Sequence, residues 1–260
     1  MKICVIGCGA MGGSMAKQLT KHHQVSLYDH HLHKAVALAQ NIGATSFGEV
    51  EPAIQGCDMI IVAVKPVHLG EAAKQFVEHI TKDQIIFSVV GSTPISVLEK
   101  HFGQVRIIRA MPNIACAFGK GVIGCVDAES VSSKTKAQVE EALSTLGWIH
   151  WVPESKIEAL TALAGSGPAF AFVILESMID AGIEMGLTSK LAKSLACEMW
   201  EGAIALIQQS GKSPCELKVD VASPGGVTVV GLHQMEQDAI RIGIMNTLFA
   251  TYKKSVDKQS

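Results

Sequence analysis

The sequence has almost no excess charge of either sign and no block of basic residues. Its 22 Lys and Arg residues stand against 24 Asp and Glu, for a formal net charge of -2 over 260 residues. Proteins that follow a nucleic-acid backbone need clustered cations to neutralise phosphates. Nucleic acid is therefore not the expected partner, and a small molecule is favoured. The length suffices for one large domain or two modest ones.

Paired cysteines are also missing, since the seven cysteines are odd in number, scattered, and contain no CxxC pair. Disulfide frameworks and structural zinc sites depend on such pairs. The histidine-rich stretch HHLH at 30–33 has no Cys, Asp or Glu set at ligand spacing beside it. We therefore expect no metal site, read these histidines as exposed loop residues, and expect a reducing cytoplasmic location.

Long apolar runs are scarce. The N-terminal stretch MKICVIGCGAMGG reaches glycine after a short apolar run, too short for the core of a signal peptide. The uncharged window 159–175 contains Gly165, Gly167 and Pro168 and is shorter than the roughly 20 residues of a membrane span. We interpret it as buried in protein and expect no membrane partner.

The N-terminal part alternates short apolar runs with helical patterns. Strands are expected at 2–6, 25–28, 59–64, 85–90, 105–110, 121–126 and 148–152, and helices at 10–21, 34–41, 68–80 and 134–146. Apolar strands that alternate with amphipathic helices predict a parallel sheet covered on both faces. The expected fold class is α/β, with a doubly wound Rossmann-type domain at 1–153.

After Pro153 no further strand is expected. Helices are predicted at 156–164, 168–185, 189–209 and 229–252, which makes 154–260 an all-helical domain. Several of these helices are apolar around most of their circumference, and a small domain cannot hide that much surface alone. A partner chain is expected, and the simplest partner is a second copy.

A glycine motif follows the first expected strand. G-x-G-x-x-G is formed by Gly7, Gly9 and Gly12 between a strand and a helix. In that context it indicates a tight turn, close backbone approach to a pyrophosphate, and free N–H groups facing the anion. Cofactor contacts are expected from the loop Gly7, Cys8, Gly9, Ala10, Met11 and Gly12.

Asp29 ends the second strand of this unit and is the expected partner of the adenosine ribose. A carboxylate there accepts a hydrogen bond from the 2'-hydroxyl and repels a 2'-phosphate, which favours NADH. The neighbouring cationic or titratable residues His30, His31, His33 and Lys34 could offset that repulsion. NADPH therefore stays open, as does a plain turn role for Asp29. His30 joins Asp29 among the expected cofactor contacts.

Two further motifs, VAVKP at 62–66 and RAMPN at 109–113, lie at expected strand ends. In an open α/β sheet the ligand crevice lies at the carboxyl ends of the strands. Further cofactor contacts are therefore expected from Ala63, Val64, Lys65, Pro66 and Asn113. A solvated lysine and a turn-forming asparagine are the structural alternatives.

The stretch SPGGVT at 223–228 combines a proline, which restricts one backbone angle, with two glycines that allow positive φ. Consecutive N–H groups at a helix N-terminus form a site for a small anion. A helix-entry loop with Ser223 as the cap is the simpler alternative.

Together these motifs resemble the pyrroline-5-carboxylate reductase family over nearly the whole chain. The resemblance is carried by IGCGAMG, VAVKP, RAMPN followed by GKG, GSGPAF at 165–170, and SPGGVT followed by GLHQME. It implies reduction of L-1-pyrroline-5-carboxylate to L-proline by NAD(P)H, and a helical domain that forms interleaved dimers or rings of dimers.

The resemblance also implies residue roles. The substrate carboxylate would be held at a dimer interface by the turn residues Ser223, Gly225 and Gly226. Thr228 would bond near the ring nitrogen and Lys65 would lie on the nicotinamide side, as the two catalytic positions. Ser166 in GSGP would form a second substrate turn, or merely cap the next helix.

The chain departs from the family at three places. Asp29-His30 replaces a pair suited to a 2'-phosphate, Val50 replaces an asparagine that contacts the adenosine, and Val227 replaces a Thr or Ala. An alcohol is too weak an acid to protonate an imine unaided, so Thr228 is expected to orient the substrate. A 3-hydroxyacid or ketopantoate-type dehydrogenase would need a lysine in 168–185, which has none. A non-catalytic nicotinamide-binding regulator is the other alternative.

Overall fold

The computed structural model describes residues 1–129 and 131–257 and divides into two compact units. Unit 1 comprises residues 1–166 and 251–260, and unit 2 comprises residues 167–250. Positions 258–260 of the expected helical domain lie outside the described residues. The expected combination of a Rossmann-type domain and a helical domain is confirmed.

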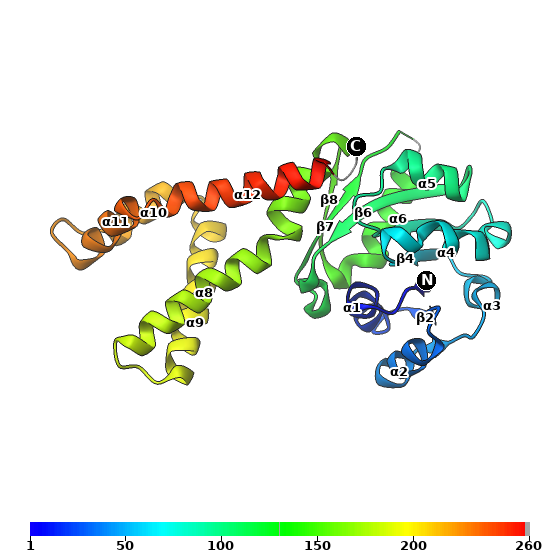
Figure 1. Cartoon of the computed structure of the whole chain (residues 1–260), viewed down its shortest axis with the longest axis horizontal. Coiled ribbons are helices and arrows are strands. Elements are labelled where there is room, and N and C mark those ends of the chain that lie inside the picture. The colour runs from blue at the N-terminus through cyan, green and yellow to red at the C-terminus, as the bar shows by residue number, and fades with distance from the viewer. Residues whose placement is uncertain (130, 258–260) are drawn as a thin grey trace. The chain divides into compact units, whose positions relative to one another are not determined.

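Unit 1 is built on an eight-stranded sheet with the order β3-β2-β1-β4-β5-β6-β7-β8 (Figure 1). Its strands are β1 (Lys2–Ile6), β2 (Gln24–Tyr28), β3 (Thr45–Ser46), β4 (Met59–Val62), β5 (Ile85–Ser88), β6 (Arg106–Pro112), β7 (Gly121–Val126) and β8 (Gly147–Val152). The first six strands in this order, from β3 through β1 to β6, pair in parallel, as expected. Because β1 lies between β2 and β4, the loops after β1 and β4 meet at the crevice where such sheets bind ligands.

The other edge of the sheet corrects the expectation of a wholly parallel sheet. Strand β7 pairs antiparallel with β6 and parallel with β8. Only a short 3-10 segment, η3 (Ile114–Phe118), lies between β6 and β7. A parallel pair needs a crossover of a dozen residues or more, so this short connection forces the chain to reverse direction.

Helices cover both faces of the sheet, and the alternation of side chains along β1 shows why. Ile3 and Val5 pack in one buried cluster with α1 (Ala10–Leu19), α2 (Leu32–Ile42) and α6 (Ser133–Leu143). Cys4 and Ile6 face the other side, in a cluster with α3 (Val50–Ile54), α4 (Leu69–Phe76) and α5 (Ile95–Phe102). Successive residues of a strand point to opposite faces, so an apolar strand needs cover on both. Strand β3 and helices α3 and α5 are short and were not expected from the sequence.

The boundary between the two compact units lies after residue 166, whereas the sequence predicted a domain boundary after residue 153. Residues 154–166 form η5 (Glu154–Lys156), α7 (Ile157–Leu160) and a π-helical turn, η6 (Thr161–Gly165). The buried Arg109 of β6 donates to Glu154 Oε1 at 2.9 Å and to Glu158 Oε1 at 2.5 Å. A buried guanidinium needs such partners, so Arg109 ties this segment to the sheet.

Unit 2 consists of helices α8 (Gly167–Glu184), α9 (Ser189–Ser210), α10 (Pro214–Val221), α11 (Val227–Gln237) and most of α12 (Ile240–Asp257). Helix α10 was not expected. The single helix expected at 229–252 is two helices, broken at Ala239, whose φ of +52° lies in the left-handed region. A non-glycine residue is strained there, and the helix cannot continue through it.

Candidate cofactor and substrate site

The three glycines between β1 and α1 have separate structural reasons. Gly7 has φ +99°, and a Cβ there would lie 2.7 Å from the Ala63 carbonyl oxygen. A Cβ on Gly12 would lie 2.0 Å from the Gly7 oxygen, so the helix start packs directly on the turn. Gly9 has nothing within 4 Å of the same position. The loop therefore closes on itself at Gly7 and Gly12 and leaves space at Gly9 for an approaching pyrophosphate.

The loop borders a cavity of about 490 Å³ in unit 1. Seven of the expected cofactor residues line it: Gly7, Gly9, Asp29, His30, Ala63, Val64 and Lys65. Cys8, Ala10, Met11, Gly12, Pro66 and Asn113 do not line it. The first-turn N–H groups of α1 also remain available, because its N-cap, Gly9, has no side chain to occupy them. These features fit a dinucleotide cofactor.

Asp29 is a structural member of the loop as well as a pocket residue. Its Oδ2 accepts a hydrogen bond from the Cys8 N–H at 2.8 Å, and its Oδ1 accepts one from the His31 N–H at 2.9 Å. A carboxylate oxygen has a second acceptor position, so both oxygens can still receive a ribose hydroxyl. Burial, together with the Asp29 charge, raises the pKa of the neighbouring Tyr28 phenol. Asp29 thus orders the glycine loop while facing the cavity.

Cys8 lies in the loop but is not a reactive group. Its pKa is raised to about 12, first by burial and then by the nearby Asp29 charge. Its Sγ donates to the Tyr28 carbonyl oxygen at 3.7 Å. A thiol with so high a pKa carries almost no thiolate at neutral pH and packs as a small apolar side chain.

Lys65 follows β4 and precedes a short 3-10 segment, η1 (Pro66–His68). Its side chain is exposed, lines the cavity, and forms no salt bridge with any residue in the described part of the chain. Pro66 occupies the first position of η1, where its missing N–H and restricted φ suit a helix start. Lys65 is therefore a free cation on the cavity wall.

Asn113 has a structural role that the sequence suggested only as a turn former. Its Oδ1 accepts from the N–H groups of Ala115 and Val122, each at 3.2 Å, and its Nδ2 donates to the Ala164 carbonyl at 2.9 Å. The residue is 6% exposed. Both acceptor positions and one donor are used, so the side chain joins β6, β7 and η6.

The cavity also includes residues that sequence reasoning missed. Tyr28 ends β2, His68 ends η1, and α4 contributes Glu71, Ala72 and Gln75. Tyr28 donates its hydroxyl proton to Gln75 Oε1 at 2.9 Å, which joins two walls of the cavity. No short motif marks these positions, because α4 reaches the cavity only through its packing on the sheet.

The SPGGVT stretch in unit 2 forms a tight turn followed by α11. The Gly226 N–H donates to the Ser223 carbonyl at 2.9 Å, and Gly225 has φ +70°. This matches a type II turn, with Pro224 second and glycine third. The N-cap of α11 is Gly226 and makes no side-chain cap hydrogen bond, so the expected cap role of Ser223 is wrong. A Cβ on Gly226 would lie 2.4 Å from Ser223 Oγ, which leaves no space for a side chain.

Ser166 is not a helix N-cap either. Its backbone is helical (φ -89°, ψ -23°), and its N–H donates to the Thr161 carbonyl at 2.9 Å. An N-cap has extended backbone angles. Ser166 therefore continues the π-helical turn η6, and Pro168 lies in the first turn of α8.

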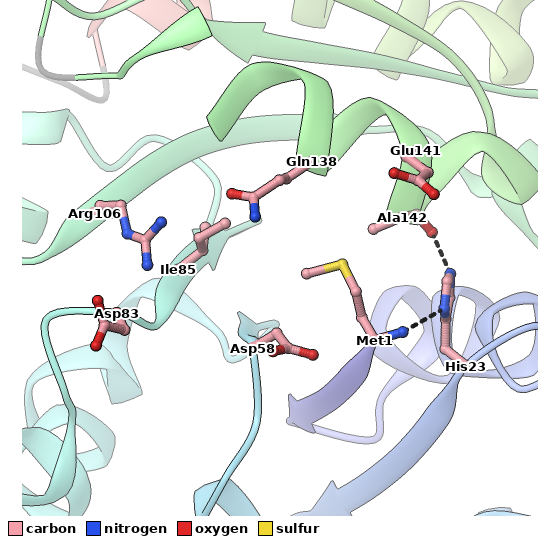
Figure 2. A pocket seen from close by; sticks show the side chains of 9 residues that line it. All are labelled: Met1, His23, Asp58, Asp83, Ile85, Arg106, Gln138, Glu141 and Ala142. Atoms are coloured by element: carbon pink, nitrogen blue, oxygen red, sulfur yellow. Dashed lines mark hydrogen bonds between the residues drawn. The ribbon is translucent and has the colours of Figure 1, made fainter. Parts of the chain in front are cut away.

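A second cavity, of about 240 Å³, lies at the amino ends of the strands of the same sheet (Figure 2). Its walls include Met1, Asp58 and Asp83, which precede β1, β4 and β5, and Arg106 at the start of β6. None of the expected site residues lines it. Doubly wound sheets bind ligands at the carboxyl ends of their strands, so the larger cavity is the better candidate.

The histidine-rich stretch is a loop only in part, which corrects the expectation: His30 and His31 precede α2, and His33 lies in its first turn. His30, His31 and His33 are exposed, and their rings lie 5.4 Å and 5.8 Å apart in sequence order. Within residues 1–129 and 131–257, no group of three His, Cys, Asp or Glu side chains is arranged to hold a metal ion.

Known protein families match both parts of the chain. Residues 154–258 match a family model described as pyrroline-5-carboxylate reductase dimerisation. Residues 2–92 match a model described as NADP oxidoreductase, coenzyme F420-dependent. The two matches agree with the division into a nucleotide-binding part and a helical part.

Similar proteins and structures extend over the full chain. Pyrroline-5-carboxylate reductases of Arabidopsis thaliana and Methanosarcina acetivorans are each 30% identical over 98% of this chain, and cover 94% and 96% of those proteins. The crystal structure of Plasmodium falciparum pyrroline carboxylate reductase with NADP bound superposes with a TM-score of 0.90 at 28% identity, covering 100% of this chain and 98% of that one. The reductase of Coxiella burnetii gives a TM-score of 0.88 at 26% identity, covering 99% and 98%. The chain therefore belongs to the pyrroline-5-carboxylate reductase family.

Proposed function

We propose that this chain reduces L-1-pyrroline-5-carboxylate to L-proline with a reduced nicotinamide cofactor, the last step of proline synthesis. One observation carries the proposal. A chain similar to pyrroline-5-carboxylate reductases over 98% of its length also arranges an open glycine loop, Asp29 and Lys65 around one cavity. Family membership identifies the substrate, and the cavity has the groups that a dinucleotide needs.

When bound, the reduced nicotinamide supplies a hydride to C5 of the imine, which accepts it best when the ring nitrogen is protonated. The chain's own contribution is to hold a small zwitterionic substrate in a productive orientation. Positioning of this kind is worth about 7 kcal/mol or more of the barrier in well-oriented reactions. No strong base is needed, because the hydride acceptor already carries positive charge.

The turn before α11 is the proposed holder of the substrate carboxylate. The Gly226 N–H is used within the turn, so it is not available to an anion, contrary to the simplest expectation. The N–H groups of Gly225, Val227 and Thr228 have no hydrogen-bond partner in the part of the chain that the structure describes. Free N–H groups at a helix N-terminus bind carboxylates well. Gly226 and Ser223 then shape the turn, and these three amides would bind the anion.

Thr228 is the proposed partner of the ring nitrogen. It is the second residue of α11, next to the proposed carboxylate site, and its side chain is half-buried. Its hydroxyl both donates and accepts, so it can orient the ring and relay a proton from water. Lys65 is proposed to act on the nicotinamide side, where a free ammonium orders polar groups of the cofactor. Asn113 is proposed to contact the cofactor and Ser166 the substrate. Each would do so through a backbone group or through a side-chain donor that no contact within the chain uses.

We propose that NADH is the preferred cofactor near neutral pH. The support is Asp29, whose two oxygens keep acceptor positions toward the cavity and whose charge opposes a 2'-phosphate. Asp29→Ser should shift the ratio of kcat/KM for NADPH over NADH upward by roughly tenfold or more, the value of a hydrogen bond to a charged group. Asp29→Asn removes the charge and keeps one of the two oxygens that accept from the Cys8 and His31 N–H groups, so the melting temperature of both variants is measured to detect damage to the loop. An unmoved ratio in Asp29→Ser would show that the ribose is recognised elsewhere.

Self-association as an interleaved dimer, or as a ring of dimers, is proposed for the helical part. The support is the dimerisation match over 154–258 and the apolar residues exposed on its helices. A reducing cytoplasm is the proposed location, which suits the seven free cysteines.

The test of the reaction is direct. Purified protein is mixed with NADH or NADPH and pyrroline-5-carboxylate, the loss of reduced-nicotinamide absorbance is followed, and proline is identified by mass spectrometry. Cofactor binding is first verified by fluorescence titration. If the cofactor binds but neither its oxidation nor proline is detected, the proposed reaction is wrong.

A further inference from the structure

Two histidines and a lysine lie beside Asp29 in the larger cavity. His30, His31 and Lys34 line the cavity beside Asp29, and all three side chains are exposed. We propose that protonated His30 and His31, together with Lys34, bind the 2'-phosphate of NADPH, so that cofactor choice moves from NADH toward NADPH as pH falls. The inference rests on the proposed function and identifies the residues of that same pocket that select the cofactor.

Local backbone hydrogen bonds hold these side chains near the ribose acceptor. The His31 N–H donates to Asp29 Oδ1 at 2.9 Å, and the Lys34 N–H donates to the His31 carbonyl at 2.8 Å. The rings of His30 and His31 have centroids 5.4 Å apart. Asp29, both imidazoles and the start of α2 therefore form one local unit, and a phosphate on the ribose 2'-oxygen would enter among them.

The acidic and the basic residues that line the cavity are equal in number, so the protonation of its histidines sets the sign of its net charge. Asp29 and Glu71 are acidic, while Lys34 and Lys65 are basic. Tyr28 stays neutral, because burial and Asp29 raise its phenol pKa. The remaining titratable residues that line the cavity are His30, His31 and His68. With neutral imidazoles the cavity has no net attraction for a phosphate, and each added proton makes it more positive.

The direction of the pH effect follows from linkage. Histidine ordinarily titrates near pH 6.5, and a bound phosphate favours its charged form. NADPH binding would thus take up protons, so its affinity is high below the histidine pKa and falls as pH rises through it. NADH carries a hydroxyl at this position and gains nothing from these protons. The 2'-phosphate itself loses charge near pH 6, which opposes the effect and must be separated from it.

Binding measurements without substrate test the inference. Dissociation constants of NADPH and NADH are measured by fluorescence at about pH 6 and about pH 8. The preference for NADPH over NADH should rise roughly tenfold at the lower pH, from two exposed ion pairs of about threefold each. The double variant His30→Gln with His31→Gln should lose this rise, although the phosphate titrates as before. Lys34→Met should weaken NADPH binding at both pH values.

His33→Gln is the matched control. His33 lies in the first turn of α2, is exposed, and has its ring 5.8 Å from that of His31, but it does not line the cavity. This variant should keep the full pH response. NADH affinity at about pH 8 is measured for every variant, and each NADPH affinity is expressed relative to it; His33→Gln should leave both unchanged. If the double variant changes NADH affinity, the single variants His30→Gln and His31→Gln are used in its place. Each should show about half of the wild-type pH response.

Two results would overturn the inference: a preference that does not change with pH in the wild-type chain, or a double variant with the wild-type response. Neither result contradicts the proposed function, because that function is tested separately by the formation of proline with NADH. Conversely, a chain that makes no proline can still show the binding response.

Discussion

The two compact units bury their apolar side chains to very different degrees. In unit 1, every residue of β4 and β5 is buried, and helices close both faces of the sheet. In unit 2, which is described throughout, only Gly182, Ala192 and Ala196 are buried. Helices α10, α11 and α12 have no buried residue.

The difference shows that unit 1 is a complete folding core, whereas unit 2 is a partial one. On α9, for example, Leu195, Met199 and Leu206 are 47%, 45% and 53% exposed. Apolar surface of this extent is stable in water only when another body covers it. The dimerisation match over 154–258 identifies that body as a second copy.

The same comparison bears on membrane association. The helical stretch 154–184 is long and apolar enough to cross a bilayer, and only 17% of its most apolar window is buried within the chain. The expectation that this stretch is buried in protein therefore depends on the partner copy. Apolar composition alone does not separate a membrane helix from a helix of an interleaved dimer.

The largest effect is expected from charging the exposed face of unit 2. Met245→Glu with Phe249→Glu places two carboxylates one turn apart on α12, where the native side chains are 45% and 58% exposed. Burying unpaired charges in a dimer should weaken association by roughly 100-fold or more. Sedimentation should detect monomers and activity should be lost, while NADH still binds unit 1. Asn246→Glu, on the same helix, is the control, and a fully dimeric double variant would contradict the assignment of this face.

The complementary experiment destabilises unit 1 and leaves unit 2 unchanged. Gly12→Ala places a Cβ 2.0 Å from the Gly7 carbonyl oxygen, so it should cost about 1–3 kcal/mol of stability, as overpacking does, and abolish cofactor binding. Gly9→Ala has open space and should leave the melting temperature unchanged, while it weakens cofactor affinity. Dimers should persist in both variants. Equal thermal stability of Gly12→Ala and the wild type would show that the turn adapts.

Thr228→Ala should separate chemistry from cofactor binding. Because Thr228 belongs to unit 2 and the cofactor cavity to unit 1, kcat should fall roughly tenfold to 100-fold, the usual range for one hydrogen-bonding group in catalysis, while the NADH dissociation constant stays unchanged. Thr228→Ser should restore most of the rate by keeping the hydroxyl. An unaltered kcat in the alanine variant would make Thr228 a purely structural helix residue.

The smallest effect concerns thiol reactivity. The pKa of Cys8 is raised to about 12 and that of Cys116 to about 11, chiefly by burial, whereas Cys215 is exposed. At pH 8 a raised pKa keeps the thiol protonated, and its reactivity would return only as pH approaches that pKa. Mass spectrometry after alkylation should find Cys215 modified first. Early modification of Cys8 would mean that the glycine loop opens.

Much of unit 1 was predictable because its signals are local. The loop from β1 to α1 and the acid Asp29 follow from glycine spacing, strand pattern and chain order within one short segment. The role of Asn113 was not predictable in the same way. Its partner Ala164 lies 51 residues further along the chain, and Val122 meets it only because β7 turns back along β6.

The substrate turn shows the same limit on a smaller scale. Its composition predicted a shaped turn before a helix, and the structure has one. Which amides stay free depended on the Gly226 to Ser223 hydrogen bond, which the letters SPGG do not reveal. The break at Ala239 was missed because no glycine or proline marks it.

The sequence by itself determined the fold class, the glycine loop and the need for a partner, because periodicity and turn chemistry act between near neighbours; its motifs also carried the resemblance to the family. Only the tertiary structure decided the reversed edge of the sheet, the anchoring of residues 154–166 by Arg109, and the wall that α4 adds to the cavity. These features depend on contacts between distant segments, and such contacts exist only once the strands have paired and the helices have packed on them.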